Sequence, residues 1–78
     1  MDLRDWRRAA GVTQQELARE ACVSRGLVSQ VETGRIQPSA AFAGRVARAL
    51  SKLLNSSVNT WDIFPEQFRK PPLPGSLN

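Results

Sequence analysis

Two helix-start signals with a short break between them constrain this chain more than any other feature. Thr13 lies three residues before Glu16, the spacing at which each side chain can bond the other residue's backbone amide and start a helix. Ser24 is a second residue of the type that favours the position before a helix. The helical periodicity breaks between Ala21 and Ser24. The sequence therefore predicts two short helices joined by a tight turn of about three to four residues.

Three further helices are predicted around this pair. Apolar spacing indicates a helix over residues 3–10, which Gly11 can end in a left-handed conformation. Ser39 is suited to begin a longer helix, and Asn59 or Thr60 a short final one. The side chains expected to face inward are Leu17, Ala18, Ala21, Val28, Val31, Phe42, Val46, Ala49, Leu50 and Leu53. Trp61, Phe64 and Phe68 are expected on one side of the final helix. The predicted fold class is all-α, a compact domain of five helices.

The length of the chain places these helices in one small domain. At 78 residues the protein is near the lower limit at which a hydrophobic core sustains a fold alone. We expect residues 1–68 to form the folded domain and the proline-rich residues 69–78 to be a disordered tail. A second, ligand-sensing domain is not expected, and neither is a small-molecule ligand.

The composition excludes several functional classes. The chain has no histidine, so a hydrolytic triad or a histidine general base is impossible, and a single cysteine cannot form an internal disulfide. The five glycines are scattered and form no phosphate-binding loop. We expect no enzymatic activity, catalytic residue, metal or cofactor. The absence of a secretory signal or a long apolar run predicts a cytoplasmic protein without membrane contact.

The third predicted helix has two chemically different sides. Its inner side carries Val28, Val31 and Glu32. Its outer side is polar and free of acids, and consists of Arg25, Gly26, Ser29, Gln30 and Thr33. Phosphates would repel carboxylates on such a surface, so this side is suited to approach DNA. The net charge of +4 admits a polyanionic partner but does not prove one.

At these positions the chain resembles the lambda-repressor/Cro-type helix-turn-helix family, also called XRE-like. The resemblance extends from Leu3 to Leu50, about two-thirds of the sequence. The matching residues are Leu3, Arg4, Arg7, the run 11–18, Val23, Ser24, Val28, Ser29, Val31, Glu32, Gly34, Pro38, Ser39 and the run 47–50. Residues 61–64 resemble the short closing helix of many members. Members of this family place the third helix in the major groove of DNA.

The resemblance implies a role for each matched side chain. Base contacts are expected from Arg25, Gly26, Ser29 and Gln30, with Arg25 bidentate to guanine and Gln30 bidentate to adenine. Phosphate contacts are expected from Gln14, Thr33, Arg35 and Ser39. Arg7 and Glu32 correspond to a structural ion pair that joins the first helix to the third.

The resemblance also implies a homodimer that binds an inverted repeat in double-stranded DNA. One module of this size buries little DNA surface, so pairing is expected to supply affinity and specificity. The expected twofold interface consists of Leu54, Trp61, Ile63 and Phe64. Short members of the family include Cro-like repressors, restriction–modification controllers and antitoxins, and the first two suit a chain without a sensor domain. An antitoxin-type interaction module that also binds DNA, and a non-specific architectural binder, are the alternatives.

Three departures from the family pattern stand out. Cys22 occupies the turn position where the family usually has glycine, which predicts a turn that is either slightly strained or differently shaped. Gly26 leaves the recognition helix without a side chain, which suits a close backbone approach to DNA or room for a thymine methyl. The segment 51–57 is longer than the usual link and leaves the dimer geometry open. Arg45, Arg48 and Lys52 are interpreted as a solvated face, with an auxiliary DNA contact as the alternative.

Overall fold

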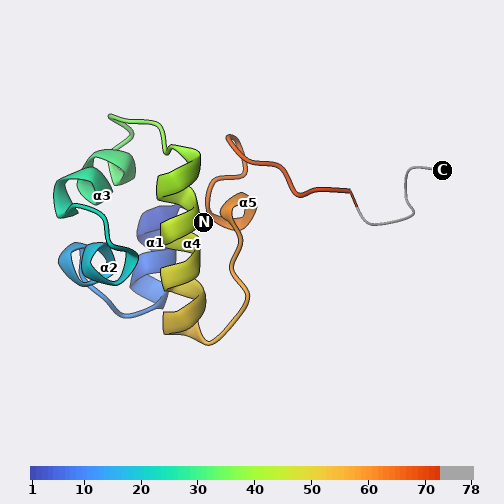
Figure 1. Ribbon diagram of the computed structural model, residues 1–78. Coiled ribbons are helices and arrows are strands. Elements are labelled where there is room, and N and C mark those ends of the chain that lie inside the picture. The colour runs from blue at the N-terminus through green and yellow to red at the C-terminus, as the bar shows by residue number, and fades with distance from the viewer. Residues whose placement is uncertain (73–78) are drawn as a thin grey trace.

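The computed structural model describes residues 1–72, which form five helices (Figure 1). The helices are α1 (Leu3–Ala9), α2 (Gln14–Ala21), α3 (Arg25–Glu32), α4 (Ala40–Leu54) and α5 (Thr60–Ile63). No strand occurs in this part of the chain, so the predicted all-α fold is confirmed. Over the same range, every helix is too short or too polar to cross a lipid bilayer. Of the tail expected over residues 69–78, residues 73–78 lie outside the described residues.

Side chains in the residues just before the helices explain where the helices begin. The Thr13 hydroxyl accepts a hydrogen bond from the Glu16 amide at 3.1 Å, and the Glu16 carboxylate accepts one from the Thr13 amide at 2.9 Å. Ser24 and Ser39 cap α3 and α4 through their hydroxyls in the same way. α1 begins with a second capping box, between Asp2 and Asp5, that our sequence analysis missed although the three-residue spacing of the two acids indicates it.

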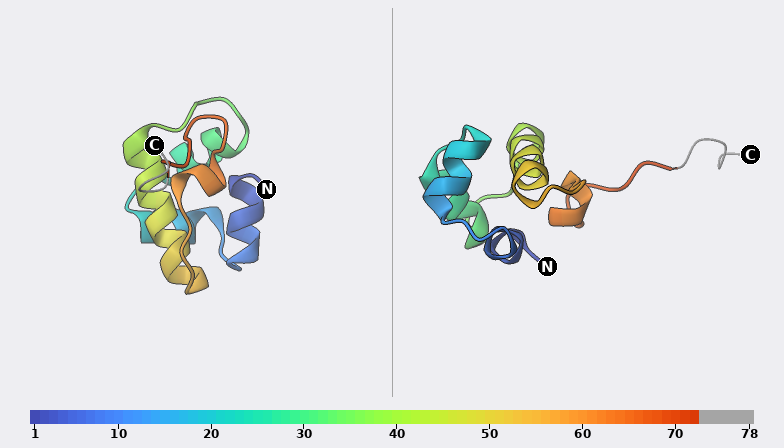
Figure 2. Two further views of the ribbon diagram at one scale, coloured as in Figure 1. Left: turned by 90° about the vertical axis from the view of Figure 1, so that its right-hand side faces the viewer. Right: turned by 90° about the horizontal axis from the view of Figure 1, so that it is seen from below.

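The core lies where α4 meets the other helices. α4 packs against α2 on one side and α5 on the other (Figures 1 and 2). The largest fully buried side chains are Leu17, Val28, Val46 and Leu50. Leu53 was expected in the core but is 37 % exposed, because Leu54, one residue further along the helix, takes the place against the core. Ala47 is buried instead.

The long link after Leu50 is mostly helix. α4 continues to Leu54 and ends at Asn55, which adopts a left-handed conformation (φ 50°) that asparagine tolerates. The chain then returns along α4, because the Ser51 hydroxyl accepts from the Val58 amide at 2.9 Å and lies 2.8 Å from the Ala47 carbonyl oxygen. The Trp6 indole donates to the Asp62 carbonyl oxygen at 3.3 Å and thereby joins α1 to α5.

A further turn after α5 completes the domain. The backbone amides of Gln67 and Phe68 both donate to the Phe64 carbonyl oxygen, at 3.2 and 3.0 Å. This places the Phe68 ring 6.3 Å from the Phe64 ring, and the Phe64 ring lies 6.3 Å from that of Phe42 in α4. The Gln67 side chain donates to the Gln37 side chain at 3.0 Å. Residues 64–68 therefore brace the loop between α3 and α4.

The turn between α2 and α3 contains a strained cysteine, and replacing it with glycine should stabilise the protein. Cys22 is exposed and left-handed (φ 57°, ψ 43°), a conformation that costs a non-glycine residue about 1–2 kcal/mol. We expect Cys22→Gly to raise the free energy of unfolding by about 1 kcal/mol, since the greater freedom of unfolded glycine offsets part of the gain. Urea denaturation tests this. Cys22→Ala keeps the strain and should show no such gain; an equal gain in both variants contradicts the explanation.

Candidate nucleic-acid interface

α2 and α3 are joined by a tight turn that fixes their relative orientation. The Val23 amide donates to the Ala18 carbonyl oxygen at 2.9 Å, and the Cys22 amide donates to that of Arg19 at 3.2 Å. These two bonds close the end of α2, and Ser24 starts α3 two residues later. Ala21 and Val28 are buried on either side of the turn. The local geometry is thus that of two short helices packed across a turn, as the sequence predicted.

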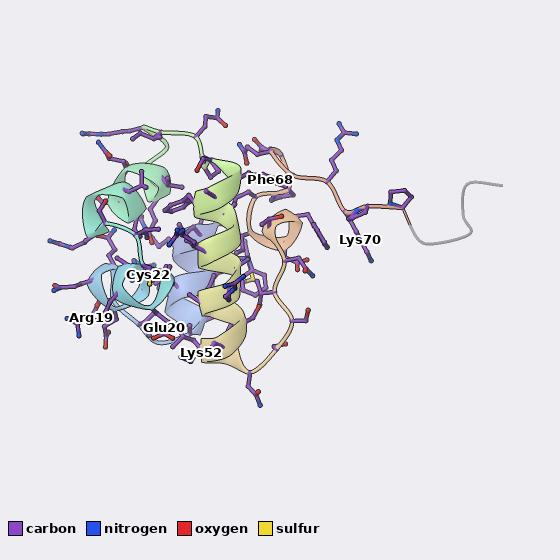
Figure 3. The ribbon with its side chains drawn as sticks, viewed as in Figure 1. Arg19, Glu20, Cys22, Lys52, Phe68 and Lys70 are labelled. Carbon is purple, nitrogen blue, oxygen red and sulfur yellow. The ribbon has the colours of Figure 1, made fainter. Side chains whose placement is uncertain are left out.

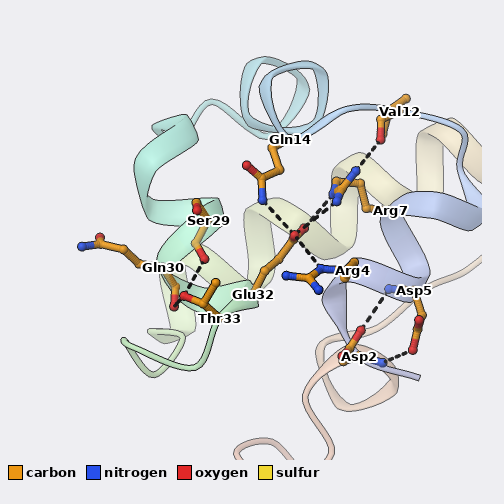
Figure 4. A network of polar contacts seen from close by, with 10 residues as sticks. All are labelled: Asp2, Arg4, Asp5, Arg7, Val12, Gln14, Ser29, Gln30, Glu32 and Thr33. Atoms are coloured by element: carbon orange, nitrogen blue, oxygen red, sulfur yellow. Dashed lines mark hydrogen bonds and ion pairs between the residues drawn. The ribbon is translucent and has the colours of Figure 1, made fainter.

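The outer side of α3 is open to solvent. Arg25, Gly26 and Gln30 are exposed and Ser29 is half-buried, so the four residues expected to contact bases share one accessible surface. The first turn of α3 contains no acid. Figure 4 shows the Gln30 side chain extending away from the buried contacts of α3. A polar, acid-free helix surface of this kind can enter the major groove without repelling phosphates.

The loop after α3 holds three residues expected to contact phosphate. Thr33, Arg35 and Ser39 are all exposed. The Arg35 amide donates to the Gln30 carbonyl oxygen at 2.9 Å, which fixes the start of the loop against α3. The Thr33 hydroxyl lies 3.0 Å from the Ser29 carbonyl oxygen, and the Ser39 hydroxyl caps α4. Two of the three side chains therefore also have a local structural role, whereas the exposed Arg35 guanidinium forms no ion pair with residues 1–72.

Glu32 anchors the inner side of α3. Its side chain has no exposed surface, and it accepts from Arg7 Nε at 2.7 Å and Arg7 Nη2 at 3.2 Å (Figure 4). Gln14 Nε2 donates to the same carboxylate at 3.0 Å, and Arg4 Nε lies 3.5 Å away. The pair of Arg7 and Glu32 was expected from the sequence, whereas the contacts from Gln14 and Arg4 were not. One carboxylate therefore joins α1, α2 and α3.

The charge of Glu32 is maintained despite its burial. Burial raises the pKa of its carboxyl group, but hydrogen bonds from Arg7 and Gln14 and the positive charge of Arg7 lower it. The net result is a pKa below the ordinary value of 4.5. Glu32 is thus a buried carboxylate whose negative charge is stabilised by the side chains that donate hydrogen bonds to it. Gln14, which was expected to contact phosphate, holds this anion through its amide nitrogen, and its amide oxygen is the side-chain atom left for another contact.

The four residues expected at a twofold interface differ in burial. Ile63 and Phe64 are 2 % and 7 % exposed and form part of the core of the single chain. The turn formed by residues 64–68 brings the Phe68 ring against that of Phe64, and sequence periodicity gave no signal for that turn. Leu54 and Trp61 are half-buried. Leu54 packs against the core, whereas Trp61 does not belong to the core cluster or to the apolar residues packed against it.

Other charged groups lie outside this surface. Lys52 pairs with Glu20 at 2.8 Å between α4 and α2 (Figure 3), and Arg45 lies 3.5 Å from the Cys22 carbonyl oxygen. Arg48 is exposed on α4. Among the residues that the structure describes, no group of acids and cysteines is arranged to hold a metal ion.

Gly26 offers a test of how closely α3 approaches DNA. A Cβ atom added there meets nothing within 4 Å, so Gly26→Ala fits the free protein, and we expect it to raise the free energy of unfolding by up to about 1 kcal/mol. Because Gly26 is one of the residues expected to contact bases, the same methyl should weaken DNA binding by about 1–3 kcal/mol, the typical cost of over-packing. Fluorescence anisotropy with a labelled duplex and urea denaturation measure the two effects.

Gly44 provides the matched control for this variant. It lies in the interior of α4, is exposed, and also has open space around an added Cβ atom. Gly44→Ala should stabilise the protein by about 1 kcal/mol and leave DNA affinity unchanged. Unchanged DNA binding by Gly26→Ala would argue against a close backbone approach at α3.

Comparison with known proteins agrees with the observed geometry. The sequence model of the helix-turn-helix domain family matches residues 2–51, which include α1 to α3 and most of α4. The chain is also similar to an uncharacterized HTH-type transcriptional regulator from Methanothermobacter thermautotrophicus, with 42 % identity over 50 residues, 64 % of this chain and 72 % of the relative. No solved structure matches the chain. The family model covers more than half of the chain, and both the packed α2–α3 pair and the similar regulator agree with it. The chain therefore belongs to the helix-turn-helix domain family.

Proposed function

We propose that this protein is a DNA-binding transcription regulator that reads sequence through α3. The observation that carries the proposal is the exposed, acid-free surface of α3, held in place from behind by the buried Glu32. Arg25, Gly26, Ser29 and Gln30 contact base edges, with Arg25 bidentate to guanine and Gln30 to adenine. Membership of the helix-turn-helix family and the name of the relative support this assignment.

The phosphate contacts of the proposal come from the start of α2 and from the loop after α3. Gln14 and the amides at the start of α2 contact one strand, and Thr33, Arg35 and Ser39 contact the other side of the groove. Arg35 supplies the charge, because its guanidinium is exposed and forms no ion pair within the described part of the chain. Thr33 and Ser39 are exposed as well, and each also forms a local hydrogen bond. These contacts position α3 and carry no sequence information themselves.

The regulator acts as a homodimer on an inverted repeat, in the manner of a Cro-like repressor or a restriction–modification controller. The support is the size of the reading surface, because a single short helix reads too few base pairs to select one site. Trp61 is the main interface residue in this proposal, since it is half-buried and lies outside the core. Leu54 contributes at the edge, and Ile63 and Phe64 support the interface from inside the chain.

Selection of the purified protein against a random duplex library tests the proposal. Recovery of an inverted repeat, with half-site centres about one helical turn or 34–36 Å apart, is the expected result. Enrichment of a single, unpaired half-site would support sequence-specific DNA binding but reject binding as a homodimer. Binding at low salt without any enriched motif would reject both, and would favour a non-specific binder or an interaction module.

A further inference from the structure

A groove next to the α3–α4 loop combines apolar and acidic residues. It has a volume of about 570 Å³ and is lined by the start of α1, by the loop after α3 and by residues 63–67. Its apolar lining includes Ile36, Pro38 and Phe64, and Ile36 is 39 % exposed. Exposed apolar residues that gather in one groove indicate a binding surface more often than scattered ones do.

The charged side chains of this groove are all acidic, and the Met1 ammonium is the one cation among its lining residues. Asp2, Asp5, Glu32 and Glu66 line it, and none of the lining residues is a lysine or an arginine. Glu32 is neutralised by Arg7. Asp2 and Asp5 bond each other's backbone amides through Oδ1 and Oδ2 respectively, which leaves the second oxygen of each carboxylate available to a cation. A groove with this lining on a protein of net charge +4 selects a cationic occupant with apolar parts.

The chain itself contains a segment of that chemistry. Arg69 and Lys70 are followed by Pro71 and Pro72, and all four residues are exposed. Neither cation forms an ion pair within residues 1–72. The two prolines favour an extended conformation, in which four residues span about 12 Å. Extended proline-rich segments bind aromatic-lined grooves at a low entropic cost, because they are already ordered before they bind.

The segment cannot readily enter the groove of its own chain. Its own groove is lined by Glu66 and Gln67, only two to four residues before the cations. Lys70 precedes a proline and is therefore restricted to extended conformations, so no tight reversal is available there. Figures 2 and 3 show the segment from Phe68 to Lys70 leading away from the domain. It leaves on the side opposite α3, which also directs it away from DNA held by α3 (Figure 1).

We infer that the segment Arg69–Pro72 of one copy occupies the acidic groove of a second copy, and that the two copies exchange these segments symmetrically. The exchange is closed, because each copy supplies one segment and one groove. It rests on the homodimer of the proposed function and adds the contact that holds the dimer together. It also joins dimer formation to DNA reading, since the groove wall contains Gly34 and Pro38, the neighbours of Arg35 and Ser39.

Charge reversal on each side of the contact tests the exchange in the absence of DNA. Glu66→Lys with Gln67→Lys sets two lysines and the Met1 ammonium against Asp2 and Asp5, which makes the groove of one variant cationic, and Arg69→Glu with Lys70→Glu makes the segment of the other anionic. By sedimentation equilibrium, we expect each variant alone to dimerise about tenfold more weakly or worse than the parent. In a mixture of the two, every segment meets a groove of opposite charge, so dimers of mixed composition should form at close to the parent affinity.

The outcomes separate this inference from the proposed function. Arg8→Glu with Arg48→Glu gives the same net charge as the segment variant on exposed sites outside the groove, and should dimerise like the parent. Unchanged dimers in both test variants overturn the exchange but leave the homodimer intact. Weakened dimers that the mixture does not restore overturn it too, in favour of binding within one chain. A parent protein that stays monomeric rejects the exchange and the homodimer together, while library selection still tests DNA reading independently.

Discussion

Arg7→Ala is expected to lower the free energy of unfolding by about 3–5 kcal/mol at neutral pH, enough to unfold a large fraction of so small a protein. The reason is the Glu32 carboxylate, which has no exposed surface and loses its bidentate partner. Arg4 and Gln14 would still contact it, but Arg4 is 42 % exposed and 3.5 Å away. Urea denaturation followed by tryptophan fluorescence measures the loss.

Two variants separate the buried charge from other effects of losing an arginine. Arg8 follows Arg7 in α1 but is exposed, so Arg8→Ala should change stability by no more than about 0.5 kcal/mol. Adding Glu32→Gln to Arg7→Ala removes the unpaired charge and keeps the shape of the side chain. We expect this double variant to be more stable than Arg7→Ala alone. If the double variant is less stable, the loss of unfolding free energy in Arg7→Ala comes from lost packing and not from the unpaired charge.

The pH dependence of this loss has a definite sign. In the parent, the pKa of folded Glu32 lies below 4.5, so its stabilising contribution is complete above that value and disappears as the pH falls through the folded pKa. Without Arg7, burial should move this pKa upward, and protonation then removes the buried charge. The stability difference between Arg7→Ala and the parent should therefore shrink between pH 7 and pH 4. A difference that does not depend on pH would contradict a charge mechanism.

The elements that the sequence predicted correctly depend on neighbours only a few residues away. The capping box of Thr13 and Glu16, the Ser24 and Ser39 caps and the break after Ala21 are all decided within about one helical turn. The same applies to the strain at Cys22, which follows from its place after α2. Such signals need no knowledge of the tertiary fold.

The elements that the sequence did not predict depend on distant contacts. Periodicity placed Leu53 in the core, and Ile63 was expected at a twofold interface, but the side on which a residue is buried depends on what packs there. Ile63 and Phe64 belong to the core of the single chain, and Phe68 packs against Phe64 from a turn that ends just before the proline-rich segment. Likewise, the contact of Gln14 with Glu32 joins residues from two helices, and no local pattern specifies it.

Arg25→Ala is expected to weaken binding to the selected DNA site by about 1–3 kcal/mol and to relax preference at one base pair of each half-site. Arg25 is the first residue of α3 and is exposed, so its removal should leave stability nearly unchanged. A bidentate contact to guanine explains a loss confined to one position, because other bases cannot accept both hydrogen bonds there. Competition binding with duplexes that vary at each position measures it.

Arg35→Ala provides the matched contrast, since it removes an exposed arginine from the loop beside the same helix. A phosphate contact should be lost equally on all sequences, and the slope of log affinity against log salt should fall by about one. Arg25→Ala should leave the relative affinities at all other positions intact and change that slope less. If Arg25→Ala instead weakens every duplex equally and lowers the salt slope as Arg35→Ala does, Arg25 contacts phosphate, and base reading must fall to Ser29 and Gln30 on the remaining surface of α3.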